Sequence, residues 1–402
     1  MFVTTAMLEA KKAAITALGE MASHCGQDFM PFIEESANVL KEAGTYWHPS
    51  IKLEVCRGYP SLVVCSVAAH HPDGKVPWEK GNLQANPMSP HTNALAGAVM
   101  AEVVPLLMNP EQEVVSGACE AIASVIELCG PASLIPVAND VLQGVLRLLS
   151  KSAPCQEEDR EELDNDDDDD EHENFMNAVT DLLGSIARVM GPQLAQFLPQ
   201  FLGPLSEYCK PSRPANDRSM AIGCLGELAQ AMGQSALPHW QAAFFPAVMA
   251  GLADPEHAVQ RNAAFAAGVC AESFGEAVAP QYQQILQALH PLFSIDASTG
   301  DSAASCVDNA AAALARMCMA APAAMPLQQV LPIFLRSLPL KSDMMENETV
   351  YSALVKMHRE GQADLRGPLQ GEVKRVVGEA LRMAKVEDEV KEQLRAEFGG
   401  GV

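Results

Sequence analysis

The chain has 402 residues, of which 48% are hydrophobic and only 5% aromatic, and its 51 acidic and 27 basic residues give a net charge of −24. Such a charge excludes nucleic acid as a partner, because phosphates require a basic surface, and it favours a basic protein. The N-terminal stretch becomes charged before an apolar core develops, and no apolar run approaches the roughly 20 residues that span a bilayer, so neither a secretory signal nor a membrane segment is expected.

Helical runs that end in a small residue recur along the chain, and the last two glycine-to-glycine intervals before the C-terminal copies are both 42 residues. The endpoints of these runs are Gly26, Gly130, Gly191, Gly233, Gly275, Ala321 and Gly361. Removing the Pro- and Gly-rich segment 72–90 and an acidic run gives the same period upstream, with one more endpoint expected near His70. Glycine is a natural helix stop because it adopts the left-handed conformation at little cost.

A second helix follows each endpoint, often interrupted by proline, as at Pro199, Pro246 and Pro332. Paired helices that repeat every 40–47 residues are typical of HEAT or armadillo proteins, and the turn at Asp254-Pro255 favours HEAT. The prediction is an all-α protein, an α-solenoid (superhelix) of about eight to nine HEAT repeats of roughly 42 residues. HEAT repeats are expected over 1–153, with a loop insertion at 72–90, and over 174–398, in one continuous solenoid.

An acidic insertion is expected at 154–173, where 157–173 alone carries 13 Asp or Glu residues against one Arg. No glycine stands where an EF-hand loop needs one, so calcium is not expected. Self-repelling charge predicts a disordered segment, which can be a solvated spacer or a trap for a polycation. The candidate contact residues in it are Asp166, Asp167, Asp168, Asp169, Asp170 and Glu171.

Counting back 3, 6, 10 and 13 positions from each endpoint follows one side of a helix, and this side is mostly small or polar. It carries seven carboxylates and one cation, which predicts an acidic groove on the concave face of the solenoid. The alternative is an ordinary solvated surface of an acidic protein. The candidate residues for holding a basic peptide are Glu120, Glu127, Asp181, Glu227, Glu272 and Asp308, with Asn262 bonding the peptide backbone.

Other candidate sites are weaker. His70, His71 and Asp73 resemble a metal-binding fragment, but no cysteine or histidine at a structural spacing completes it, so no metal is expected. Trp78 and Trp47 can be exposed anchors or can pack against a neighbouring repeat. Phosphate-loop, nucleophile-elbow and zinc-protease motifs are absent from the sequence, so neither an enzyme activity nor a cofactor is expected.

The stretch VLPIFLRSLPLKSDMMENETVY (330–351) combines an apolar proline-bent helix, the phrase LPLK and an acidic step into another helix. It resembles a repeat near the C-terminus of importin-β-type (karyopherin-β) nuclear transport receptors. The run GSIARVMGPQLAQFLPQFLGPL (184–205) and the acidic insertion strengthen the resemblance, which extends over essentially the whole chain. Because such receptors have about twenty repeats, the resemblance implies that this chain is a C-terminal fragment.

The resemblance also implies partners. They are basic proteins, notably core histones through their tail peptides and also ribosomal proteins, together with Ran-GTP and the Phe-Gly proteins of the nuclear pore for the full-length receptor. It implies shuttling between cytoplasm and nucleus. The predicted function is therefore cargo binding within a nuclear import receptor. Two alternatives stay open, a constitutive HEAT scaffold of a stable complex and a histone chaperone without a transport role.

Overall fold

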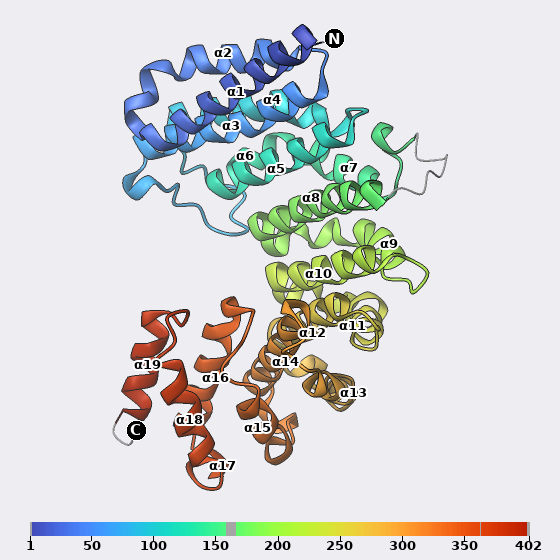
Figure 1. Ribbon diagram of the computed structural model, residues 1–402, viewed down its shortest axis with the longest axis vertical. Coiled ribbons are helices and arrows are strands. Elements are labelled where there is room, and N and C mark those ends of the chain that lie inside the picture. The colour runs from blue at the N-terminus through green and yellow to red at the C-terminus, as the bar shows by residue number, and fades with distance from the viewer. Residues whose placement is uncertain (1, 158–165, 362, 400–402) are drawn as a thin grey trace. The chain divides into compact units, whose positions relative to one another are not determined.

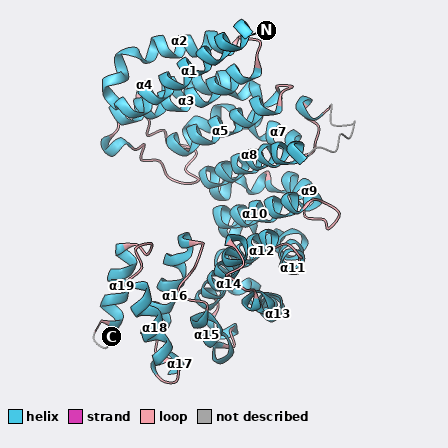
Figure 2. Cartoon of the chain, in the orientation of Figure 1, coloured by secondary structure: helices cyan, strands magenta, loops and turns pink. Residues whose placement is uncertain are grey.

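The computed structural model describes residues 2–157, 166–361 and 363–399, and within these ranges it consists of helices and connecting loops, without a strand (Figures 1 and 2). Its contacts divide the chain into two compact units, Met1–Pro204 and Leu205–Val402. Helix α9 (Leu198–Tyr208) contains the boundary between them. The predicted all-α solenoid of paired helices is confirmed.

In the first unit the helices form two layers. The helices that lead to the periodic endpoints, called B helices below, pack against one another in chain order. They are α1 (Phe2–Cys25), α3 (Pro49–His70), α5 (Gln112–Cys129) and α8 (Asp166–Met190). The shorter helices between them, called A helices, pack on this layer. They are α2 (Ile33–Gly44), α4 (Pro90–Val103), α6 (Pro131–Leu134) and α7 (Ala138–Leu149).

The second unit repeats this arrangement. Its B helices also pack in chain order, because each one needs its neighbours to bury its apolar side. They are α10 (Ala215–Met232), α12 (His257–Phe274), α14 (Asp301–Ala320), α16 (Asn347–Arg359) and α19 (Asp388–Phe398). The A helices are α11 (Phe245–Leu252), α13 (Tyr282–Leu289), α15 (Leu327–Arg336), α17 (Ala363–Arg366) and α18 (Gln370–Ala380).

The periodic glycines end B helices as predicted. All six have positive φ, between 52° at Gly26 and 82° at Gly361, which is the conformation that glycine adopts without strain. The endpoint expected near His70 is confirmed, because α3 ends at that residue. Ala321 ends α14 with φ −146°, an extended conformation that needs no glycine.

The prolines expected to bend the A helices act in two ways. Pro332 lies inside α15 as predicted. Pro199 and Pro246 instead lie in the first turn of α9 and α11, where the missing N–H has no intrahelical partner to lose. These two prolines therefore stand at the beginning of α9 and α11, after a 3₁₀ or π-helical turn.

Two segments are long and apolar enough to cross a membrane by length and composition alone, so the expectation that none approaches this length is wrong. They are Pro90–Met108 and Pro131–Gln156. The first comprises α4 and a following 3₁₀ turn, the second comprises α6, α7 and 3₁₀ turns, and these helices pack within the first unit. Since buried helices of a packed core pass the same test, this is weak evidence for a membrane span.

The segment 72–90 forms a strap across the C-terminal ends of two B helices of its own unit. The Trp78 indole lies directly over Gly130, and its Nε1–H donates to the Glu127 carbonyl oxygen at 3.0 Å. Farther along, the Gly81 N–H donates to the Val189 carbonyl oxygen at 2.9 Å. The strap therefore joins the ends of α5 and α8, and Trp78 packs against a neighbouring repeat and is not a free anchor.

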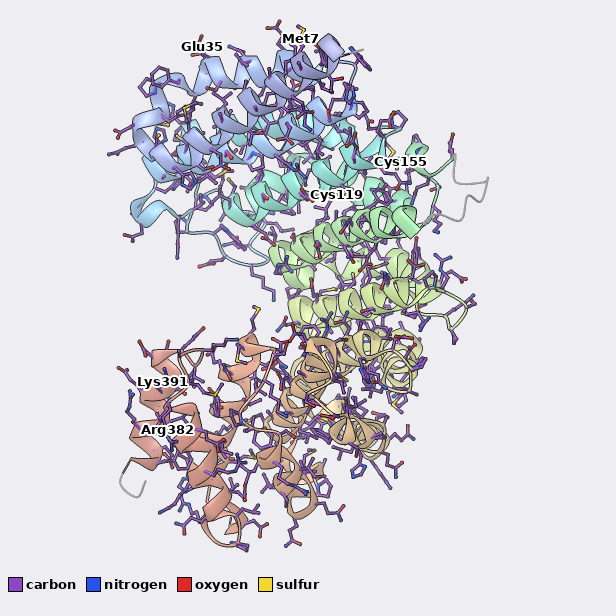
Figure 3. All side chains as sticks on the ribbon, viewed as in Figure 1. Met7, Glu35, Cys119, Cys155, Arg382 and Lys391 are labelled. Atoms are coloured by element: carbon purple, nitrogen blue, oxygen red, sulfur yellow. The ribbon has the colours of Figure 1, made fainter. Side chains whose placement is uncertain are left out.

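The acidic insertion is shorter than predicted. Cys155 and Gln156 are buried, and the Gln156 side chain donates to the Leu148 carbonyl oxygen at 3.0 Å, so 154–156 belongs to the packed array. Figure 3 labels Cys119 on α5 and Cys155 in the segment after α7. Residues 158–165 lie outside the described residues. Helix α8 begins at Asp166, so the second half of the acidic run belongs to the first turns of this helix.

Asp308 is an internal anchor. Its carboxylate is fully buried and accepts the backbone N–H groups of Lys341, Ser342 and Asp343 at distances between 2.7 and 3.1 Å. Burial raises the pKa of Asp308, and these three backbone donors oppose the increase. The prediction that Asp308 lines the groove is therefore wrong. Its side chain instead holds the loop between α15 and α16, which lies within the stretch that carries the resemblance.

We expect Gly130→Ala to destabilise the first unit by about 2–4 kcal/mol, because the new Cβ would lie 2.2 Å from Trp78 Cγ at a residue with φ +74°. Gly97→Ala is the matched control, since a Cβ at this position in α4 meets no atom within 4 Å. Midpoints of urea unfolding, followed by tryptophan fluorescence, compare the two. Equal midpoints would contradict the packing of Trp78 on Gly130.

We expect Asp308→Ala to destabilise the second unit by about 2–4 kcal/mol, because three backbone N–H groups lose a charged acceptor. Asp301→Ala, an exposed change in the first turn of the same helix, should cost under about 1 kcal/mol. Amide hydrogen exchange at 341–343 provides the local measurement. Unchanged protection of these amides in the Asp308 variant would show that the anchor is not needed.

Candidate protein-binding surface

The candidate surface is the exposed side of the B helices of the first unit. On α5, Glu120, Ser124 and Glu127 are all exposed and lie three and four residues apart, so they share one side of the helix. Asp181 and Arg188 are exposed two turns apart on α8, the next B helix. The predicted side of these two helices therefore faces solvent, as a basic ligand requires.

Glu127 does not stand free on this surface. Its Oε1 atom accepts hydrogen bonds from the Ser185 hydroxyl at 2.7 Å and from Arg188 Nε at 3.0 Å. The guanidinium Nη2 also reaches Oε1 at 2.5 Å. Because the side chains of Glu127 and Arg188 are 44% and 48% exposed, water competes with this ion pair, and such exposed pairs contribute only about 0–1 kcal/mol.

The charges of Glu127 and Arg188 also affect the pKa of Asp181. Partial burial of its carboxyl group raises its pKa, the nearby Arg188 guanidinium lowers it, and the Glu127 carboxylate raises it again. Glu120 differs, because within the described part of the chain its carboxylate has no ion pair. Asp181 and Glu120 are therefore the predicted residues that are available to an external cation.

The two upstream B helices continue the acidic side. The Glu20 carboxylate on α1 is 3.1 Å from His24 Nε2 and is exposed. The Glu54 carboxylate on α3 is mostly buried and accepts from Thr16 at 2.9 Å and from Arg57 at 3.1 Å. Each of these carboxylates thus has an internal partner, so the two upstream helices offer less available negative charge than Glu120 and Asp181 do.

In the second unit the predicted surface is largely used internally. The Asn262 amide donates to the Ser219 carbonyl oxygen at 2.8 Å and to its hydroxyl at 2.9 Å, which joins α12 to α10. Its oxygen accepts from Arg261 at 3.1 Å. The prediction that Asn262 bonds the backbone of a bound peptide is therefore not supported by its geometry, because its donors already have partners.

Farther along the chain, Arg316 of α14 pairs with acidic residues of the neighbouring repeats. Its guanidinium is only 8% exposed and lies 2.9 Å from the buried Glu346 carboxylate. Its Nε is 3.3 Å from Glu272, whose side chain is 61% exposed. Glu227, the remaining candidate, is half-buried. Glu272 and Glu346 are thus balanced by an arginine that the sequence pattern did not single out.

The charge is unequally divided between the units. The first unit has 29 acidic and 11 basic residues, a net charge of −18. The second has 22 acidic and 16 basic residues, a net charge of −6. The acidic residues Asp166–Asp170 and Glu171 lie in the first unit, so most of the attraction for a basic ligand originates there.

A different kind of site lies in the second unit, in a pocket of about 640 Å³ between α13 and α15. Its walls are apolar, and three glutamines and one histidine are its polar members. The lining includes Gln283, Leu286, Gln287, His290, Phe293, Leu314, Met325, Gln329, Val330 and Ile333. Sequence reasoning missed this pocket, because its volume depends on how far apart two A helices lie.

The remaining aromatic and histidine candidates have mixed outcomes. Trp47, in the turn before α3, is 70% exposed, so it is free to contact a partner. The His70 ring stacks on His91 at 4.7 Å, and His71 Nε2 accepts the Ser89 N–H at 3.1 Å. Among the described residues, no group of three or more His, Cys, Asp or Glu side chains is placed to hold a metal ion.

Known proteins resemble this chain in sequence. It is 27% identical over 371 residues to the probable importin subunit beta-4 of Schizosaccharomyces pombe, which covers 90% of this chain and 34% of that protein. It is 30% identical over 358 residues to importin-4 of Homo sapiens, covering 87% of this chain and 31% of that protein. The chain therefore spans about a third of the length of these relatives. A scan against models of protein families finds no match.

Known structures resemble it in fold. The karyopherin Kap121p bound to the SUMO protease Ulp1p superposes with a TM-score of 0.74 and 18% identity, covering 99% of this chain and 37% of that one. Kap121p bound to RanGTP gives 0.69 and 17%, covering 98% and 35%. In sequence the chain thus resembles importin-4 proteins over about nine-tenths of its length, and in fold it resembles karyopherins, which confirms the predicted resemblance to importin-β-type receptors.

Proposed function

We propose that this chain is the cargo-binding C-terminal part of a nuclear import receptor that shuttles between cytoplasm and nucleus. The observation that carries the proposal is the charge of the first unit, −18, together with exposed carboxylates on adjacent B helices. The sequence similarity to importin-4 proteins supports a transport role. In the complete receptor, Ran-GTP would release the cargo, as the resemblance implies.

The proposed cargo is an extended basic segment, such as a core histone tail or a basic region of a ribosomal protein. Lys and Arg side chains of such a segment form charge-assisted hydrogen bonds with carboxylates. Glu120 and Asp181 are the central contacts, and Glu127 contributes where Arg188 can be displaced. Glu20 upstream extends this surface within the first unit. Glu227 and Glu272 lie in the second unit and are not part of it, and Asp308 and Asn262 are left out because of their internal contacts.

The acidic run from Glu157 to Glu173 acts at longer range in this proposal. Opposite charges at a distance accelerate encounter more than they tighten the final complex. Because charges beyond about 10 Å are screened at 0.1 M salt, its effect depends on ionic strength. The run therefore raises the association rate of a basic cargo and contributes less to the lifetime of the complex.

The apolar pocket between α13 and α15 supports a second part of the function, docking of Phe-Gly segments of pore proteins. Apolar walls accept an aromatic side chain, and the exposed glutamine amides can bond the flanking peptide backbone. No charged side chain lines the pocket, which fits an uncharged segment. Cargo and pore contacts would then use different helices of the chain.

Replacing the two central carboxylates, Glu120→Gln with Asp181→Asn, should weaken binding of a fluorescent histone-tail peptide about 5- to 30-fold, as two exposed charge contacts contribute about 1–2 kcal/mol. Fluorescence anisotropy at 50 and 300 mM salt measures it, and wild-type affinity should fall with salt. The matched control is Glu34→Gln with Asp140→Asn, two exposed carboxylates on A helices. Salt-insensitive binding, or equal loss in both double variants, would contradict the proposed surface and favour a scaffold.

Ile333→Glu should abolish retention of the chain on an immobilised Phe-Gly peptide, because a buried carboxylate in an apolar pocket is strongly disfavoured. Ile135→Glu is the matched control, since this isoleucine is 40% exposed on an A-side turn of the first unit. Histone-tail affinity should stay unchanged in both. Retention of the Ile333 variant at the wild-type level would exclude the pocket as the docking site.

A further inference from the structure

Arg188 occupies a position where a cation of the cargo is expected. It lies on the same side of α8 as Asp181, and its guanidinium extends to Glu127 on α5. It also donates to the Ser185 hydroxyl at 2.9 Å, and that hydroxyl donates to Glu127. An arginine of this chain thus pairs with the solvent-facing Glu127 carboxylate, and its charge also acts to lower the pKa of Asp181.

The exposure of this cluster makes it exchangeable. The Glu127–Arg188 pair is about half exposed on both sides, so separating it costs about 0–1 kcal/mol. The pair between Arg316 and Glu346 in the second unit is more than nine-tenths buried on both sides. Breaking a buried pair leaves an uncompensated charge and costs about 3–5 kcal/mol, so that arginine stays in place.

The backbone beneath the cluster is fixed. The Trp78 indole donates to the Glu127 carbonyl oxygen, and the strap bonds to the end of α8 at Val189. Lys80 of the strap packs its aliphatic stem on Gly191. The backbone that carries Glu127 and the end of α8 is therefore held by contacts that do not involve Arg188.

We propose that Arg188 is an internal occupant of a cation site formed by Glu127 and Asp181, and that an arginine of the bound segment replaces it. This inference rests on the proposed function. Both described hydrogen bonds from Arg188 to Glu127 go to one oxygen, Oε1. A guanidinium supplied from solution is free to approach both oxygens in the bidentate geometry that a lysine ammonium cannot form.

Two consequences follow for specificity. A single cation gains little, because it must displace one that is already there, so the site selects segments with several basic residues. Arginine is favoured over lysine at the position that meets α5 and α8. Arg188 is thus a specificity-determining residue that weakens binding to sparsely charged segments.

The test compares Arg188→Gln with Arg147→Gln, which removes the same charge from an exposed arginine on the A helix α7. The probes are an arginine-rich and a lysine-rich peptide of equal length, titrated by anisotropy at 50 mM salt. Arg188→Gln should tighten both by about 2- to 5-fold, because the internal competitor is gone, and should leave the preference for arginine unchanged, because that preference comes from bidentate bonding to a carboxylate. Arg147→Gln should change neither by more than about 2-fold, and Arg188→Lys should fall between wild type and Arg188→Gln.

A pH series separates this role from a structural one. Without Arg188 the pKa of Asp181 loses the group that lowers it, so the gain in affinity should shrink as the pH falls from 7 to 5. Weaker or unchanged binding by Arg188→Gln, with wild-type binding intact, would overturn the inference and leave the proposed function standing. Binding by Arg188→Gln alone would support the inference and reject the wild-type chain as a cargo receptor. Binding by neither would reject both.

Discussion

The structure depends on the side-by-side packing of successive B helices. A single helical pair cannot bury its apolar side alone, so each repeat is stable only against its neighbours. The glycines at the ends of six B helices make this packing possible at a regular interval, because the chain turns there toward the next A helix without strain. The exposed side of the same helices is then free to carry charge without cost to the core.

The fold was predictable because its signals are local and repeated. A period of 42 residues, glycines at helix ends and prolines in the partner helices all occur within single repeats. The loops that interrupt the period were also identified, although the acidic one is shorter than expected. Its edges are set by packing at Cys155 and by helix α8, which composition alone does not reveal.

The candidate site was only partly predictable, for a different physical reason. Helical spacing places Glu120 and Asp181 on the solvent side, and the structure agrees. It places Asp308 and Asn262 there too, but their partners lie 33–43 residues away in other repeats, and no local pattern reports such contacts. Arg188 was located on the same side, yet its pairing with Glu127, 61 residues upstream, depends on how two helices pack.

The strap has a mechanical consequence for the first unit. In an ideal solenoid each repeat contacts only its nearest neighbours, so the array can bend at every boundary between repeats. The strap leaves the end of α3, covers the end of α5 at Gly130 and bonds to the end of α8 at Val189. It therefore connects three consecutive B helices, α3, α5 and α8, and restricts bending at the boundaries between them. Boundaries without such a connection keep their freedom to bend.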